Sequence, residues 1–154
     1  MQVENINKRN LLKNLKAIID DDVPLIANLS NISRLLEESF ANSLWCGFYL
    51  SDEEGKTLYL GPFQGPLACT KIPFGRGVCG TSALHKTTCL VPNVHDFSGH
   101  IACSSLSNSE IVVPIIKNDK VVGVIDLDST LYNNYDLEDQ ELLEAAAKII
   151  SELF

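Results

Sequence analysis

Residues 110–128, with the sequence EIVVPIIKNDKVVGVIDLD, decide the fold of this chain. Two apolar runs, residues 110–116 and residues 120–128, flank the short polar segment 117–119. Apolar runs of this length that are rich in Val and Ile are typical of β-strands. A tight polar turn between two such runs predicts an antiparallel hairpin.

A helix is expected after this hairpin. Asp136 is a suitable N-cap residue, and Asp139 stands three residues later. Beyond them apolar residues recur at helical spacing, at Leu142, Leu143, Ala146, Ile149, Ile150 and Leu153.

Two more helices are expected in the first third of the chain. The first carries an apolar stripe at Leu11, Leu12, Leu15, Ile18 and Ile19. After three aspartates at residues 20–22, Pro24 suits the first turn of the second helix. The stripe of that helix is Ile26, Leu29, Ile32, Leu35, Leu36 and Phe40.

The middle of the chain is predicted to form strands. Residues 44–50 and 56–60 flank a polar turn, and glycines and prolines precede a third run at residues 67–72 that contains Cys69. A short helix at residues 81–85 and a short strand at Leu90 and Val91 follow. Strands joined by hairpins, together with these helices, indicate an α+β fold with an antiparallel sheet.

The length and composition indicate one domain over residues 1–154 and narrow the function. The chain has 12 basic and 20 acidic residues, a net charge of −8, which argues against nucleic acid and anionic lipid as partners. No run approaches the ~18 apolar residues that a membrane helix needs. The N-terminus does not resemble a signal peptide, so a cytoplasmic location is expected.

The cysteines are five in number, so they cannot all pair within one chain. No CxxC motif is present, and structural disulfides are rare in a reducing cytosol. Cys103 is the best candidate nucleophile because it lies on a polar loop where a thiol is accessible. Cys79 follows glycines at a helix start, where the helix dipole is expected to lower its pKa. Cys46 and Cys89 are interpreted as core residues.

Residues 91–109 form a long segment with little periodicity, which is interpreted as an ordered lid. His95 and His100 lie in it, and with Cys89 and Cys103 they offer an alternative set of zinc ligands. Their spacing matches no common structural zinc motif.

Three carboxylates and two aromatic rings are candidate pocket residues. Asp126 and Asp128 stand two apart on an apolar strand and therefore share one face, and Glu110 opens the partner strand. Buried carboxylates are costly unless partnered, so they suggest a site for a cation, a metal such as Mg²⁺ or Ca²⁺, or a polar substrate group. Trp45 and Tyr49 share a strand face and could form the wall of an apolar subpocket.

Five sequence strings together are distinctive: residues 60–65 (LGPFQG), 75–80 (GRGVCG), 99–103 (GHIAC), 107–114 (SNSEIVVP) and 123–129 (GVIDLDS). In these strings and in its cysteine spacing, the chain resembles the free methionine-(R)-sulfoxide reductases, a catalytic branch of the GAF domain fold. Cys79 follows Cys69 by 10 positions and Cys103 follows Cys79 by 24. The resemblance runs from about Trp45 to the C-terminal helix.

The resemblance implies a single GAF-like domain with an antiparallel sheet of about six strands. Its N- and C-terminal helices would cover one face, and a loop would cover a pocket on the other. The resemblance also implies that Cys103 is catalytic, that Cys69 and Cys79 are candidate resolving thiols, and that Trp45, with Tyr49, holds the substrate methyl group. A homodimer and thioredoxin as electron donor are further implications.

The implied chemistry suits the residues. Thiolate attack on a sulfoxide needs a proton for the departing oxygen, which a buried carboxylic acid can supply. Glu110 and Asp128 are expected to polarise or protonate the sulfoxide, and Asp126 to shape the site or bind the substrate ammonium. The sequence shows no flavin, metal or nicotinamide motif, so no bound cofactor is expected. Ser104 stands where the family usually has Asp, which changes the charge beside the thiol.

A different class of function remains open: a non-catalytic GAF module that senses a small ligand or an oxidant through its cysteines. It predicts tight ligand binding without thiol-dependent turnover.

Overall fold

The computed structural model describes residues 7–99, 103 and 105–154. Its elements follow the order expected from the sequence, with a short 3₁₀ helix, η1, inside the predicted lid segment. They are α2 (Leu11–Ile18), α3 (Leu25–Ser39), β1 (Ser43–Ser51), β2 (Thr57–Gln64), β3 (Lys71–Pro73), α4 (Gly77–His85), β4 (Cys89–Val91), η1 (Val94–Asp96), β5 (Ser109–Lys117), β6 (Lys120–Ser129) and α5 (Leu137–Ser151).

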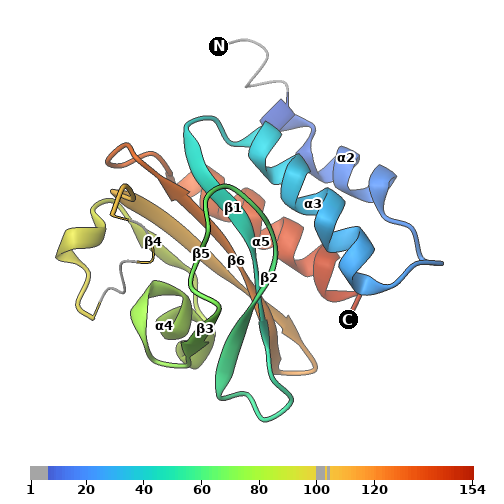
Figure 1. The fold of residues 1–154 in the computed structure, drawn as a ribbon. Helices are drawn as coiled ribbons and strands as arrows, with labels where there is room; N and C mark the ends of the chain where they lie inside the picture. The colour runs from blue at the N-terminus through green and yellow to red at the C-terminus, as the bar shows by residue number, and fades with distance from the viewer. Residues whose placement is uncertain (1–6, 100–102, 104) are drawn as a thin grey trace.

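The strands form one six-stranded sheet in the order β3-β2-β1-β6-β5-β4, and every neighbouring pair is antiparallel. Helices α2, α3 and α5 lie on one side of this sheet, and α4 lies on the other (Figure 1). The predicted α+β class and antiparallel sheet are therefore confirmed. In the part of the chain that the structure describes, no helix is both long and apolar enough to cross a membrane.

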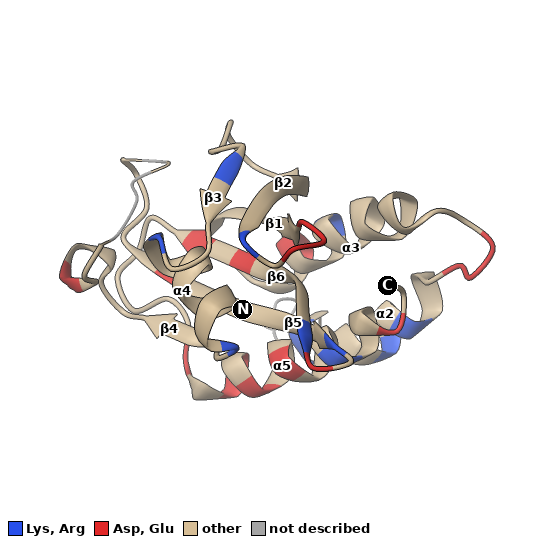
Figure 2. Ribbon diagram, turned by 90° about the horizontal axis from the view of Figure 1, so that it is seen from below, with Lys and Arg blue, Asp and Glu red and all other residues tan. Residues whose placement is uncertain are grey.

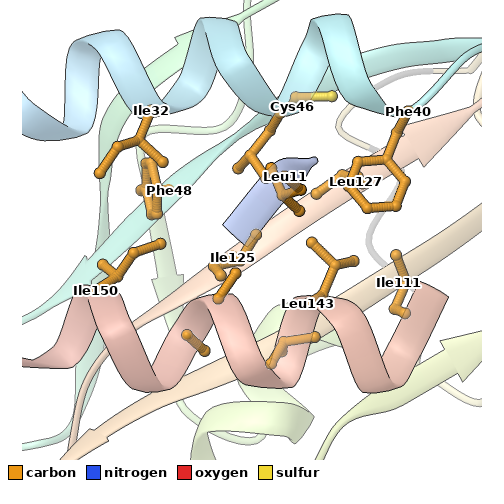
Figure 3. Close-up of a cluster of buried hydrophobic side chains, with 14 of the residues drawn as sticks. Leu11, Ile32, Phe40, Cys46, Phe48, Ile111, Ile125, Leu127, Leu143 and Ile150 are labelled. Carbon is orange, nitrogen blue, oxygen red and sulfur yellow. The ribbon is translucent and has the colours of Figure 1, made fainter. Parts of the chain in front are cut away.

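The larger hydrophobic core lies between the sheet and the α2, α3 and α5 layer. Figure 3 shows its side chains pointing from both helices and strands into one cluster. Strand residues alternate between this core and the opposite face, as the two-residue period of a strand requires. On β5, Ile111 and Val113 enter the core, whereas Val112 between them belongs to a second cluster on the α4 side.

Helix α5 begins as the sequence predicts. The Asp136 side chain accepts a hydrogen bond from the backbone N–H of Asp139 at 2.8 Å. The Asp139 side chain accepts one from the backbone N–H of Asp136 at 3.0 Å. This reciprocal capping box fixes the point at which the chain turns from the sheet into the helix.

Three boundaries differ from the sequence prediction. Strand β2 continues through Gly61 and Pro62, because short β3 pairs only with residues 57–59 and the outer edge of β2 needs no donor at Pro62. The third strand is shorter than predicted, so Cys69 lies before β3 rather than in a strand. Helix α4 starts at Gly77, which places Cys79 inside its first turn.

Gly47 allows β1 and β2 to approach closely where they hold the pocket. A Cβ atom at this position would lie 2.4 Å from the Cβ of Phe63 and 2.8 Å from the carbonyl oxygen of Pro62. Real Cβ atoms do not approach a backbone so closely, so a side chain here would force the two strands apart.

We expect Gly47→Ala to lower the free energy of unfolding by about 1–3 kcal/mol, because the added methyl group overpacks the β1–β2 contact. Urea denaturation monitored by circular dichroism measures the change. Gly61→Ala is the matched control: its Cβ would meet the Phe48 carbonyl oxygen at 3.1 Å and the movable Leu50 side chain at 3.2 Å. Equal losses in the two variants would contradict the steric explanation.

Candidate active site

A pocket with a cavity volume of about 50 Å³ opens on the α4 side of the sheet. Seven of the eight predicted site residues line it: Trp45, Tyr49, Cys79, Cys103, Glu110, Asp126 and Asp128. The eighth, Cys69, is bonded to Cys103. The structure thus brings together residues from β1, α4, β5, β6 and the two segments that carry the disulfide.

Strand register sets the positions of the carboxylates. Asp128 on β6 pairs directly with Glu110 on β5 and, on its other side, with Trp45 on β1. Asp126 lies one step along the same face of β6, opposite Gly47. Since Gly47 has no side chain, Asp126 has no side-chain neighbour across that strand pair.

Glu110 and Asp126 are buried, and Asp128 is half-buried. Glu110 is 6% exposed and Asp126 5%, and burial is the first cause that raises the pKa of Glu110, Asp126 and Asp128 above the ordinary value. The negative charges of Asp126 and Asp128 raise the pKa of Glu110 further. Acidic residues also lie along α5 and in the α2–α3 loop, as Figure 2 shows. The pocket carboxylates differ from those in their position, because they line a pocket on the α4 side of the sheet.

Neighbouring donors distinguish the three carboxylates. The Ser107 hydroxyl donates a hydrogen bond to Asp128 Oδ1 at 3.0 Å, which stabilises charge on Asp128. The Cys79 thiol lies 4.0 Å from Glu110 Oε1 and donates a hydrogen bond to it. Asp126 Oδ1 is buried and has no hydrogen-bond partner among the described residues. Ser107 was not predicted as a site residue.

Cys103 and Cys69 form a disulfide at this pocket, with their Cα atoms 5.4 Å apart. The sequence left the partner of Cys103 open between Cys69 and Cys79. The structure also places Cys103 in a bond, not as the free accessible thiol that its loop suggested. Cys46, Cys79 and Cys89 are free.

The prediction that the pKa of Cys79 is lowered was wrong. The thiol lies at the start of α4, but it is 4% exposed and burial raises its pKa. The charges of Asp126, Glu110 and Asp128 raise it further. Burial and three carboxylates therefore outweigh the helix dipole, which typically contributes only ~0.3–1 kcal/mol near a surface. Cys46 is a core residue, as expected, and burial raises its pKa to about 12.

An aromatic wall lies beside the carboxylates on the same face of the sheet. The Trp45 ring stacks on Tyr49, with centroids 5.7 Å apart, and on Phe63 at 5.2 Å. The Tyr49 hydroxyl donates to the carbonyl oxygen of Cys69 at 2.9 Å, which joins this wall to the disulfide segment. Phe63 was missed because the sequence placed a break at its position, although it stands in the quoted string LGPFQG.

The described residues do not support the zinc alternative. The Cys103 sulfur is bonded to Cys69, and His95 Nε2 lies 3.0 Å from Asn108 Oδ1. His100, and Ser104 at the departure from the family pattern, lie outside the described residues. The donor atoms that converge most closely belong to Cys79, Glu110 and Asp126, within 4.8 Å of one another. A thiol in that group does not suit Mg²⁺ or Ca²⁺, which prefer oxygen ligands.

We expect Glu110→Gln to raise the free energy of unfolding at about pH 8 by on the order of 1 kcal/mol or more, because the neutral amide avoids the cost of a buried charged carboxylate. A carboxyl whose pKa rises on folding does not lower the free energy of unfolding while the pH is below its unfolded pKa. As the pH rises from there toward the folded pKa, the free energy of unfolding of the protein falls. The gain should disappear near about pH 4, in urea denaturation of the oxidised protein. Glu53→Gln, on the exposed β1–β2 turn, is the control; a gain that does not depend on pH would contradict this account.

A family profile and individual relatives place this chain in the same family. The GAF domain profile matches residues 24–152. GAF domain-containing protein A of Dictyostelium discoideum is 48% identical over 92% of this chain and 88% of its own length. The free methionine-R-sulfoxide reductase of Saccharomyces cerevisiae is 46% identical over 96% of this chain and 87% of its own.

A solved structure agrees with these relatives. The X-ray structure of free methionine-R-sulfoxide reductase from Neisseria meningitidis, in complex with its substrate, superposes with a TM-score of 0.91 and 44% identity. The match covers 96% of this chain and 87% of that one. This chain belongs to the GAF domain family, and its close relatives in that family include free methionine-R-sulfoxide reductases.

Proposed function

We propose that this protein reduces free L-methionine (R)-sulfoxide to L-methionine. The observation that carries the proposal is the Cys69–Cys103 disulfide at a pocket that combines buried carboxylates with an aromatic wall. A thiol pair supplies two electrons, an acid supplies the proton, and the rings accommodate a methyl group. Relatives named for this activity support the same assignment.

The pocket has a complement for each part of the substrate. The ammonium group of a free amino acid binds at the carboxylates, where its positive charge offsets their mutual repulsion. The methyl group at the sulfur packs against Trp45 and Tyr49. Asp126, whose Oδ1 lacks a donor among the described residues, is the carboxylate we assign to the ammonium.

The reaction begins with the reduced enzyme. The Cys103 thiolate attacks the sulfoxide sulfur, and a proton passes to the sulfoxide oxygen. The resulting hydroxyl moves from the methionine sulfur to Cys103 Sγ as the transient S–S bond between the two sulfurs breaks, which releases methionine and leaves Cys103 as a sulfenic acid. The Cys69 thiol then condenses with this sulfenic acid, which forms the disulfide and releases water. Two thiols are oxidised while one sulfoxide is reduced.

In the first step, Glu110 and Asp128 polarise or protonate the sulfoxide. An isolated carboxyl is ionised at neutral pH, but burial and neighbouring charges raise the pKa of Glu110 well above its ordinary range. Burial and these charges thus favour the protonated form of the carboxyl that we place beside the reacting oxygen, and a general acid must hold such a proton.

The enzyme returns to its reduced form by thiol–disulfide exchange with an external dithiol. Thioredoxin is the reductant we propose, in a reducing compartment such as the cytoplasm, and no bound cofactor is needed for these steps. The homodimer that the family resemblance implies stays a prediction.

We expect NADPH consumption in a coupled assay with thioredoxin and thioredoxin reductase when free methionine (R)-sulfoxide is added. Cys103→Ser should abolish it, because the nucleophile is lost. Cys69→Ser should release one equivalent of methionine and then stop with a sulfenic acid on Cys103. Cys89→Ser, which removes a free half-buried thiol, is the control and should keep the wild-type rate.

Equal rates with both sulfoxide epimers, or turnover by Cys103→Ser, would overturn the proposal. Tight substrate binding without any turnover would instead indicate a sensor module.

We expect Glu110→Gln to lower kcat by on the order of 10²-fold or more, because an amide of the same shape cannot donate the acid proton. Single-turnover release of methionine from the reduced enzyme measures the chemical step without the reductant. Asp52→Asn, on the β1–β2 turn away from the pocket, is the control. An unchanged rate in Glu110→Gln would exclude Glu110 as the acid.

A further inference from the structure

We infer that Cys79 is a positioning residue of the acid cluster and not a thiol of the redox cycle. Its S–H group donates to Glu110 Oε1 and thereby keeps the acid proton of Glu110 on Oε2. This inference rests on the proposed reductase function, which assigns the acid role to Glu110. The family resemblance implied that Cys79 is a candidate resolving thiol for Cys103. In the structure Cys103 is bonded to Cys69, and Cys79 lies beside Glu110 and Asp126.

The position of Cys79 follows from how tightly α4 packs. A Cβ at Gly80 would lie 2.5 Å from the carbonyl oxygen of Pro73, so only glycine lets the helix lie this close to β3. The helix also packs on β5 and β6. Cys79, in its first turn, is therefore held over the two strands that carry the carboxylates.

The polar atoms around the thiol are carboxylate oxygens. Sγ lies 4.0 Å from Glu110 Oε1, and Cys79, Glu110 and Asp126 each contribute one atom to a group within 4.8 Å. A thiol hydrogen that occupies Oε1 leaves Oε2 as the oxygen that holds the acid proton of Glu110. The geometry of the donor thus selects one of two otherwise similar oxygens.

These surroundings also make Cys79 a poor resolving thiol. Exchange and condensation reactions need a thiolate. Cys79 is 4% exposed, and burial and the three carboxylates raise the pKa of its thiol. Cys103 is already paired with Cys69, and Cys79 remains free in that oxidised state.

The groups around Cys79 come from every element packed against α4 or against the pocket. Glu110 lies on β5, Asp126 and Asp128 on β6, and Tyr49 on β1. The half-buried thiol of Cys89 lies on β4. The cations Arg76, at the start of α4, and Lys71, on β3, are both exposed. The acidic groups are therefore the ones that respond to a change at Cys79.

Loss of the Cys79 thiol should shift the pH profile of kcat in one direction. A hydrogen bond donated to a carboxylate favours its charged form, so the Cys79 thiol that donates to Glu110 Oε1 favours the charged form of Glu110. Its removal should raise the pKa of the acid cluster. The alkaline limb of kcat, where the general acid loses its proton, should then move to higher pH in Cys79→Ala, by about one unit.

The experiment compares Cys79→Ala and Cys79→Ser with wild type, and with Cys89→Ala as the control. We expect Cys79→Ala to lower kcat by about tenfold and to shift the alkaline limb upward. Cys79→Ser should restore most of both, because a hydroxyl donates as a thiol does. Mass spectrometry after one turnover should find Cys69–Cys103 in every variant, and no disulfide that contains Cys79.

Two results would overturn the inference. A disulfide between Cys79 and Cys103 in wild type, with sulfenic acid accumulating in both Cys79 variants, would make Cys79 a resolving thiol. An unchanged rate and pH profile in Cys79→Ala would make it an uninvolved core residue.

A readout independent of activity separates this inference from the proposed function. The S–H stretching band that Cys79→Ala lacks should shift in Glu110→Gln if the thiol bonds to Glu110. If wild type reduces no sulfoxide, the reductase proposal fails, while this band still tests the hydrogen bond. A band unaffected by Glu110→Gln would contradict the contact itself.

Discussion

The cross-strand pair of Glu110 and Asp128 is the constraint on which the site depends. Two carboxyl groups lie directly opposite each other on a buried face of the sheet, where like charges are destabilising. The pair is more stable with one proton than with both carboxyl groups ionised, because a shared proton removes the repulsion between two negative charges. The two carboxyl groups of the pair have different donors: the Ser107 hydroxyl donates to Asp128, and the Cys79 thiol donates to Glu110.

The same register builds the rest of the pocket. Trp45 pairs with Asp128 on the side away from Glu110, so the aromatic wall and the acid cluster are neighbours along one row of the sheet. Gly47 keeps the next row open beside Asp126 and lets β2 bring Phe63 against Trp45. The opposite face of these strands is filled by the large core under α2, α3 and α5, which holds the rows in place.

Features that depend on local sequence were predictable. The two-residue period of a strand is enough to place Asp126 and Asp128 on one face, and the Asp136–Asp139 pair marks the start of α5. That Glu110 shares this face depends on the β5–β6 register, which shifts between Ile115 and Ile116. The GAF fold followed from the family strings. The order of the helices and strands came from periodicity and from the glycines and prolines between them.

Features that depend on distant neighbours were not predictable. The length of β2 depends on how far β3 pairs alongside it, and the choice of Cys69 as partner depends on where the β2–β3 segment passes the pocket. The pKa of Cys79 was misjudged because its controlling groups lie on β5 and β6, more than 30 positions away in the chain. Phe63 escaped notice since a strand through Gly61 and Pro62 requires an unpaired edge.

The disulfide also closes the chain into a covalent ring between positions 34 residues apart, and the ring contains β3, α4, β4 and η1. A cross-link of this span removes unfolded-state entropy equivalent to about 4 kcal/mol in the chain-entropy description. The oxidised protein therefore opens less often than the reduced protein, and proteases that cleave opened chains act on it more slowly.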